Sequence, residues 1–298
     1  MESACDLSRR LRAVLMPDAG IGPLARMVDE LAMHAPIPSE DRGLLLALPC
    51  VSRVFEAGGC LVREGDAHDH CGMLVSGMAC RYGTSGDGAR QIVAIHVPGD
   101  VFDLPVMHPR RADHDVRALS RCEVVMVPLD ALRGLAADRP SVGRAILAVA
   151  SVELSMAREW MLNIGRRDAR TRIAHLLCEL AERLDQRSAA PVWSYELPMT
   201  QEQLGDALGL TSVHVNRMLK GLVSDGLIDY GRRGISIPDR EALARVGDFD
   251  GRYLYGRIRP DRLDGRMPGI GAGLVPAGMR RTVPEGTRSS RGLEGSAE

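Results

Sequence analysis

The segment 198–237 constrains the fold more than any other part of the chain, because it carries the start and stop signals of two short helices in succession. Thr200 and Gln203 form a capping box, which predicts the start of a helix. Gly209 predicts its end, since glycine readily takes the left-handed conformation that terminates helices. Thr211 predicts the cap of a second helix. Two short helices joined by a tight glycine turn are typical of a helix-turn-helix.

The stretch that follows predicts a β-hairpin. Residues 227–230 and 235–237 lie on either side of a Gly-Arg-Arg-Gly turn and show the alternation expected of paired strands. A helix-turn-helix followed by a hairpin is a winged helix, whose second helix enters the major groove of DNA. A winged helix used only for protein contacts is the alternative.

The second helix carries polar side chains suited to reading DNA. Arg217 can contact guanine bidentately, and Asn216 can contact adenine. Lys220 is the only lysine in the chain. The formal net charge of −1 gives no global attraction to nucleic acid, so DNA contacts must come from local patches. The predicted DNA-binding residues are Thr200, Thr211, Ser212, Val213, His214, Asn216, Arg217, Lys220, Arg232 and Arg233.

Residues 163–237 resemble the DNA-binding domain of the Crp/Fnr family of bacterial transcription regulators, and the likeness continues into the N-terminal half. The resemblance implies a sequence-specific regulator that acts as a homodimer and is not an enzyme. It also implies two further partners, double-stranded DNA with a roughly palindromic operator and RNA polymerase. No apolar stretch approaches the length of a membrane span and no signal peptide is evident, so we expect a cytoplasmic protein without a membrane partner.

The N-terminal half predicts many short strands punctuated by glycine and aspartate, which is typical of a sandwich or barrel. The predicted strands are residues 51–55, 60–63, 71–75, 78–82, 90–96, 116–118 and 123–128. The order of the turns at 64–66, 76–77 and 98–100 resembles the β-roll sensor domain of the same family.

The predicted fold class is therefore α+β, with an N-terminal antiparallel, jelly-roll-like β-roll, a long dimerisation helix and a C-terminal winged helix-turn-helix. The expected domains are a helical arm (1–48), a cyclic-nucleotide-binding-like roll (49–138), the dimerisation helix (139–165), the DNA-binding domain (166–247) and a disordered tail (257–298). Within the arm, Ser39 is expected to cap a helix.

The long helix is expected from Pro140 to about Asn163, with Gly165 breaking it. Its apolar residues recur at alternating three- and four-residue spacing, as in a helix that pairs with another helix. The helix lying on its own roll is the alternative, and the resemblance favours a dimer seam. The predicted seam comprises Val142, Ala145, Val149, Val152 and Met156.

The sensor half departs from its cyclic-nucleotide-binding relatives. Those relatives carry a Glu for the ribose and an Arg-Ser pair for the phosphate. Here Leu104, or Asp103 with a one-residue shift, holds the Glu position, and Ala112 and Asp113 replace the pair. The pattern disfavours cyclic AMP or GMP, so the roll senses another signal or has lost its ligand. The candidate effector pocket comprises His96, Asp103, Leu104, Arg110, Arg111 and Asp113.

Cysteine and histidine positions bear on cofactors. An iron–sulfur cluster needs four convergent cysteines. The N-terminus offers only Cys5, and core packing accounts better for Cys60, Cys71 and Cys80. The sequence therefore disfavours such a cluster. The rival functional class is a cupin-like metal enzyme built on the roll from His96, His108 and His114. The chain lacks a tight His-x-His triad with a glutamate, and this rival leaves the winged helix unexplained.

Overall fold

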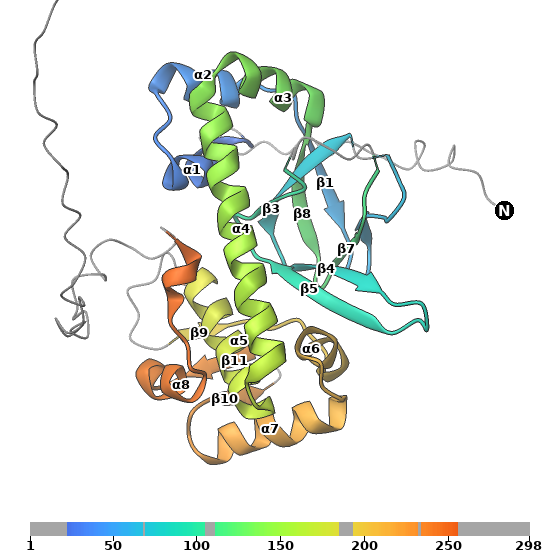
Figure 1. Ribbon diagram of the computed structural model, residues 1–298, viewed down its shortest axis with the longest axis vertical. Coiled ribbons are helices and arrows are strands. Elements are labelled where there is room, and N and C mark those ends of the chain that lie inside the picture. Colours follow the sequence, from blue (N-terminus) through green and yellow to red (C-terminus); the bar gives the residue numbers. More distant parts are fainter. Residues whose placement is uncertain (1–22, 68, 105–110, 185–192, 232–233, 256–298) are drawn as a thin grey trace, which may run out of the picture.

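The computed structural model describes residues 23–67, 69–104, 111–184, 193–231 and 234–255, and these confirm the predicted α+β fold class. Helix α4 (Pro140–Arg166) runs the length of the molecule, with the roll and the first helices at one end and the winged helix at the other (Figure 1). The predictions for residues 1–22 and for the tail, 257–298, lie outside the described residues.

Three shorter helices cover one end of the roll. They are α1 (Ala25–His34), α2 (Ser39–Leu46) and α3 (Leu129–Asp138). The predicted cap at Ser39 is wrong, because Ser39 is already helical and Pro38 occupies the cap position without a side-chain hydrogen bond. Instead, the carboxylate of Asp41 accepts a hydrogen bond from the hydroxyl of Ser141, which joins α2 to the start of α4.

The roll consists of two antiparallel four-stranded sheets with strand orders β1-β8-β3-β6 and β2-β7-β4-β5. All seven predicted strands are present within two residues at either end, and one strand of two residues, β6, was not predicted. The strands are β1 (Val51–Phe55), β2 (Cys60–Val62), β3 (His70–Ser76), β4 (Ala79–Thr84), β5 (Arg90–His96), β6 (Val101–Phe102), β7 (Asp115–Ala118) and β8 (Cys122–Pro128).

A close approach between β3 and β6 explains one glycine of the roll. The ring of Phe102 is fully buried between the sheets and lies over Gly72. A Cβ atom at position 72 would lie 2.2 Å from Cζ of Phe102, so only glycine leaves room for the ring. The ring fills the roll together with Leu74, Val116 and Val124.

Helix α4 differs from the sequence prediction in two ways. The helix continues through Gly165 and ends at Arg166, and the backbone of the next residue, Arg167, is extended. A single glycine weakens a helix by only about 1 kcal/mol relative to alanine. Trp160 and Asn163, which are buried and form hydrogen bonds with α5, hold the end of the helix in place.

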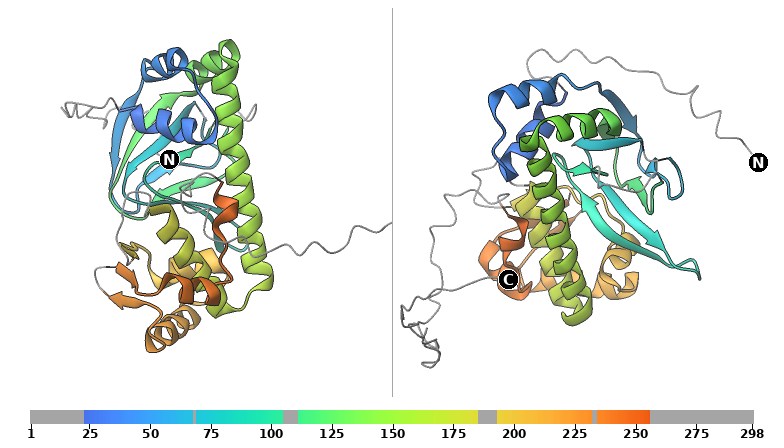
Figure 2. Two further views of the ribbon diagram at one scale, coloured as in Figure 1. Left: turned by 90° about the vertical axis from the view of Figure 1, so that its left-hand side faces the viewer. Right: turned by 45° about the horizontal axis from the view of Figure 1, so that its top comes forward.

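The second correction concerns the predicted dimer seam. Val142, Ala145, Val149 and Val152 are buried inside their own chain, where the first three pack with α1 and the roll, and Met156 is half-buried. Figure 2 (left) shows why: α4 forms one edge of the molecule, and the rest of the described chain lies on one side of it. The outward stripe of α4 instead carries Leu147, Leu154 and Met161, which are 57–74% exposed.

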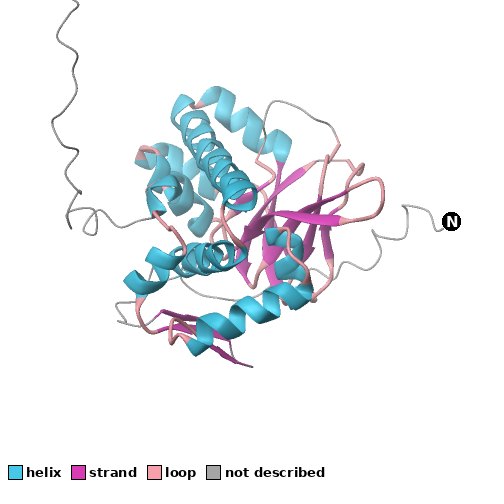
Figure 3. Ribbon diagram, turned by 60° about the horizontal axis from the view of Figure 1, so that its bottom comes forward, coloured by secondary structure: helices cyan, strands magenta, loops and turns pink. Residues whose placement is uncertain are grey.

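The C-terminal part contains α5 (Ala169–Leu184), β9 (Trp193–Tyr195), α6 (Gln201–Leu208), α7 (Ser212–Ser224), β10 (Asp229–Gly231), β11 (Gly234–Ile237), α8 (Arg240–Val246) and a 3₁₀-helix, η2 (Gly251–Leu254). The predicted hairpin is β10–β11, and β9, which was not predicted, extends it to a three-stranded sheet. Figure 3 shows this small sheet apart from the strands of the roll, with helices between them. No helix of the described residues is long and apolar enough to cross a membrane.

Candidate nucleic-acid interface

Helix α6 and the turn after it are fixed by local hydrogen bonds. The Thr200 hydroxyl accepts the N–H of Gln203 at 3.1 Å, and the Gln203 side-chain oxygen accepts the N–H of Thr200 at 2.8 Å. Gly209 ends the helix with a φ of 65°. Gly205, which the sequence analysis overlooked, lets the turn fold back, because a Cβ there would lie 2.4 Å from the carbonyl oxygen of Leu210. A glycine inside a short helix was the available signal.

Helix α7 separates its side chains onto an inner and an outer face. Thr211 caps it by accepting the N–H of His214 at 3.3 Å. On the inner face Val215, Leu219 and Leu222 are buried in one core with α5 and α6. The side chains that lie exposed on the outer face are Ser212, Val213, Arg217 and Lys220, whereas His214 and Asn216 are half-buried.

The two cations of α7 are available to an external partner. Neither Arg217 nor Lys220 forms a hydrogen bond or an ion pair with any residue that the structure describes, apart from the helix backbone. The acids that flank α7 in the sequence are both occupied. Asp206 pairs with Arg90 of β5 at 2.5 Å, and Asp225 pairs with Arg170 of α5 at 2.5 Å.

The wing is held to the domain by main-chain pairing. Tyr230 pairs with Ile235, and Ile235 pairs in turn with Tyr195 of β9. Gly234 has a φ of 125°, and a Cβ there would lie 2.2 Å from the carbonyl oxygen of Tyr195, so the end of the turn requires glycine. Arg232 and Arg233, two of the predicted DNA-binding residues, fall outside the described residues.

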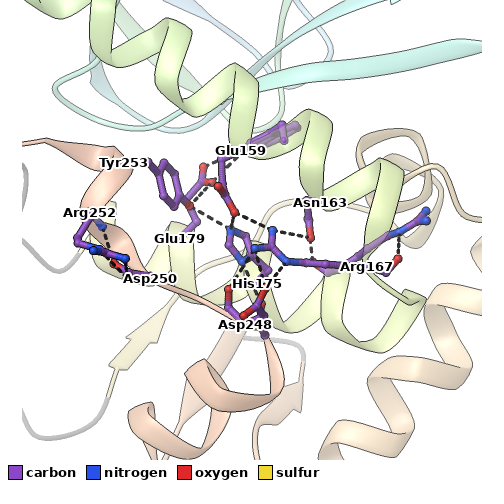
Figure 4. A network of polar contacts seen from close by, with 12 residues as sticks. Glu159, Asn163, Arg167, His175, Glu179, Asp248, Asp250, Arg252 and Tyr253 are labelled. Carbon is purple, nitrogen blue, oxygen red and sulfur yellow. Dashed lines mark hydrogen bonds and ion pairs between the residues drawn. The ribbon is translucent and has the colours of Figure 1, made fainter. Parts of the chain in front are cut away.

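A buried polar network fixes α5, and with it α7, to the long helix. Both carboxylate oxygens of Glu179 accept the indole N–H of Trp160 from α4, at 3.0 and 3.2 Å. The Tyr253 hydroxyl of η2 donates to the same carboxylate at 2.8 Å. Burial, followed by the charge of Glu179, raises the pKa of Tyr253 far above its usual range. Arg167 adds an ion pair with Asp248 at 3.1 Å (Figure 4).

Arg183 joins the winged-helix end of the molecule to the roll. Its guanidinium lies 2.5 Å from the carboxylate of Asp100 in the turn before β6, and it donates to the carbonyl oxygen of Ile95 at 2.7 Å. It also donates to Glu179 at 3.1 Å. Its side chain is only 2% exposed, so a buried charge of α5 is neutralised in part by the roll.

A cavity of about 180 Å³ lies between the roll, α4 and α5. Its charged and polar lining includes Arg81, His96, Asp100, Glu153 and Arg183, of which only His96 belongs to the predicted effector pocket. Burial, followed by the charge of Arg81, lowers the pKa of His96 to about 3, so its ring is neutral.

Asp103, rather than Leu104, presents its side chain inside the roll. Its carboxylate lies 3.3 Å from Arg81 and 2.9 Å from Nε2 of His114, and its backbone has a φ of 56°. Burial alone would lower the pKa of His114, but the hydrogen bonds to Asp103 and Asp113 outweigh it and raise the pKa. The sequence could not show that Arg81 pairs with Asp103, because these two residues lie 22 positions apart.

The remaining predicted pocket residues lie elsewhere. Leu104 packs with the core beneath α1. Asp113, predicted to belong to the effector pocket, is 81% exposed, pairs with His114 at 2.6 Å and does not line the cavity. Arg111 is exposed and donates to the carbonyl oxygen of Gly65. Arg110, like His108 of the rival metal site, lies outside the described residues.

Four of the described cysteines, Cys71, Cys80, Cys122 and Cys178, are buried, whereas Cys50 and Cys60 are half-buried. Cys71 lies in the core beneath α1 and Cys80 in the core shared with the winged helix, so they do not converge. Burial raises the pKa of Cys71 to about 12 and that of Cys80 to about 11, which disfavours the thiolate that a metal requires. Among the described residues, no three His, Cys, Asp or Glu side chains are grouped to hold a metal ion.

Two family models match the two ends of the chain. A cyclic nucleotide-binding domain matches residues 52–139, and a Crp-like helix-turn-helix domain matches residues 171–246. The second match contains α6, α7 and the wing, which are the elements described above as a candidate DNA interface.

Curated relatives and solved structures agree with these matches. The transcriptional activator protein FnrL of Cereibacter sphaeroides is 33% identical over 201 residues, which is 66% of this chain and 80% of the relative. The nitrogen fixation regulation protein FixK of Azorhizobium caulinodans is 31% identical, over 65% of this chain and 77% of the relative. The structure of FixK2 from Bradyrhizobium japonicum superposes with a TM-score of 0.60 at 29% identity, and the match covers 67% of this chain and 98% of that one.

Proposed function

The chain belongs to the Crp/Fnr family of transcription regulators, and on that premise we propose that it is a homodimer that places its two α7 helices in a roughly palindromic DNA site. The family is a class of DNA-binding regulators rather than enzymes, and the comparisons give no support to the cupin-like alternative. DNA lies in the cytoplasm of a bacterium, so a cytoplasmic location is part of the proposal.

The free outer face of α7 is the observation that carries the DNA part of the proposal. Arg217 and Lys220 are exposed and unpaired among the described residues, while the nearest acids in the sequence are neutralised. In the proposed complex Arg217 contacts guanine, Asn216 contacts adenine and Lys220 contacts a phosphate. The other proposed contacts come from Thr200, Thr211, Ser212, Val213, His214, Arg232 and Arg233.

The outward stripe of α4 supports the dimer. Leu147, Ser151, Leu154, Arg158 and Met161 follow one another at spacings of four, three, four and three residues and are all exposed. This is the a/d spacing of a two-helix seam. Three of the five positions are large apolar side chains, which would be buried by a second copy of α4. The proposed seam therefore replaces the stripe first predicted from the sequence.

The dimer fixes the geometry of DNA reading. Two recognition helices related by a two-fold axis meet successive major grooves when they lie about 34 Å apart, one helical turn of DNA. A shift of one subunit along the α4 seam would change that separation. The roll touches the DNA-binding domain through Arg183, so a signal received there has a route to α7. A DNA-bound dimer would then act on transcription through RNA polymerase.

Selection from a random DNA library tests the DNA part of the proposal. The wild-type protein should enrich a site with two-fold symmetry, whereas the Lys220→Ala variant should bind every sequence less tightly and show a log–log salt dependence smaller by about 0.9. Val223→Ala, a neutral change on the same helix, is the matched control. Failure of the wild-type protein to enrich any sequence contradicts the proposal.

Sedimentation of two α4 variants tests the seam. Leu154→Asp puts a charge on the exposed stripe and should give a folded monomer with weak operator binding. Val152→Asp puts the charge into the chain's own core and should lower the free energy of unfolding, because a buried unpaired charge is costly. A Leu154→Asp variant that sediments as an unchanged dimer would place the interface elsewhere.

A further inference from the structure

Val213 is an apolar side chain placed where α7 meets solvent. It is the second residue of the helix and is 78% exposed, more than Leu147 or Met161 on the outward stripe of α4. The apolar residues that anchor α7, Val215 and Leu219 among them, lie on the opposite face. The packing of the domain therefore does not account for a valine at this position.

The position of Val213 relative to the free cation indicates its surroundings in a DNA complex. Val213 and Arg217 are four residues apart, so they lie side by side on the outer face of the helix. Val213 stands in the first turn, and the N-terminal residues of a recognition helix are those that reach the base edges. An exposed isopropyl group here would enter the major groove ahead of Arg217.

One group of the major groove suits such a side chain. The C5-methyl of thymine is the apolar feature that distinguishes base pairs there, and apolar side chains recognise it by contact. An acidic residue would instead accept a hydrogen bond from cytosine N4, and α7 carries no acidic residue. Against cytosine, Val213 would cover an amino group without giving it a partner, which is unfavourable.

We infer that Val213 is a specificity-determining residue that selects thymine in each half-site by packing against its C5-methyl group, an inference that rests on the proposed DNA-reading role of α7. The spacing locates the base. Four residues advance about 6 Å along a helix, and successive base pairs rise about 3.4 Å. The thymine should lie within about two base pairs of the guanine that Arg217 contacts.

Replacing thymine by uracil tests the inference, because it removes the methyl group and leaves every hydrogen-bonding group in place. Each thymine of the selected operator is replaced in turn by deoxyuridine, and the affinity is measured by fluorescence anisotropy. Burial of one methyl group corresponds to about fourfold in affinity. The wild-type protein should lose about fourfold at one thymine per half-site. Val213→Ala, which lacks both γ-carbons, should lose less than the wild type at that thymine.

A matched control keeps the result specific. Val223 lies on the same helix near its C-terminal end and is 40% exposed, so Val223→Ala should keep the full uracil penalty. Circular dichroism and thermal melting show whether each variant is folded. A Val213→Ala variant that loses as much at every uracil as the wild type, or an operator without a thymine near the guanine, overturns the inference. A wild-type protein that selects no DNA contradicts the proposed function instead.

Discussion

The outer face of α7 and the interior formed by the roll and α5 both carry charged side chains, but only those in the interior are neutralised by partners of the same chain. Arg81 pairs with Asp103, and Arg183 pairs with Asp100 and Glu179. Arg217 and Lys220 have no such partner among the described residues. Paired buried charges stabilise or couple parts of the fold, whereas unpaired surface charges are available to a ligand. This difference supports the proposal that α7 recognises DNA, and it indicates that the buried charges of the roll and of α5 are structural.

The largest expected effect follows from removing the charge shared by the roll and α5. Arg183→Met would leave Asp100 and Glu179 buried without this cation, so the free energy of unfolding should fall by about 3–5 kcal/mol. Chemical denaturation measures the loss. Arg245 pairs with Glu241 at 3.8 Å on an exposed face, so Arg245→Met should stay within about 0.5 kcal/mol of the wild type. Equal losses for the two variants would remove the distinction between buried and exposed charge pairs.

On α7 the expected effect lies in binding rather than stability. Arg217→Ala should weaken operator binding by about 1–3 kcal/mol and relax the preference at one base pair per half-site. Its free energy of unfolding should change by less than about 0.5 kcal/mol, because Arg217 is exposed and unpaired among the described residues. Binding is measured by anisotropy and unfolding by urea titration. A variant with unchanged sequence preference would show that this register of the helix is wrong.

A smaller effect is expected from His114, which lies between Asp103 and Asp113 at the edge of the roll. Its pKa is raised in the folded protein, so its contribution to stability is complete below the unfolded value of about 6.5. That contribution is lost as the pH rises through the folded pKa. The buried His96 has the opposite effect, since its depressed pKa costs stability as the pH falls below about 6.5.

His114→Gln isolates the first contribution, because His96 and Arg81 remain in both proteins. The difference in unfolding free energy between wild type and variant should be about 1 kcal/mol or less. It should favour the wild type near pH 6 and shrink by about pH 9. Urea titrations at both pH values measure it. A difference that grows with pH would mean that burial, and not the two aspartates, dominates the pKa of His114.

Features that depend on interactions between residues close in the sequence were predicted correctly, whereas features that depend on long-range contacts were not. The α6–α7 unit was predictable because its caps and its terminating glycine act within four residues. The strands of the roll were predictable from their turns, except β6, which is only two residues long and pairs with β3 where Phe102 lies over Gly72. The apolar pattern of α7 did not show whether Val213 is buried or exposed, since a valine can occupy either face of a helix.

The long helix shows what periodicity leaves undecided. Its sequence carries two apolar stripes, one through Val149 and Val152 and one through Leu147 and Leu154, and both have helical spacing. Only the tertiary structure shows that the first faces the chain's own core. The pairing of Arg183 with Asp100 was equally inaccessible, because the two residues are 83 positions apart and on different domains of the prediction.

The smallest expected effect is that of cyclic AMP or cyclic GMP, for which no stabilisation is predicted. The cavity of about 180 Å³ is below the range of roughly 300–1,000 Å³ usual for ligand sites. Its cations, Arg81 and Arg183, already bind Asp103 and Asp100, so a cyclic phosphate would have to break buried ion pairs.

A ligand that binds only the folded state at a hundredfold excess over Kd would raise the free energy of unfolding by about 2.7 kcal/mol. For a protein of this size that is a rise in melting temperature of roughly 2–4 °C per kcal/mol. Thermal melting at millimolar nucleotide, with operator binding measured alongside, provides the test. A clear rise in melting temperature together with ligand-dependent DNA binding would show that the ion pairs of the roll open to bind a phosphate. The charges of the roll would then be paired only in the absence of ligand, and the contrast with the unpaired charges of α7 would not hold in the ligand-bound protein.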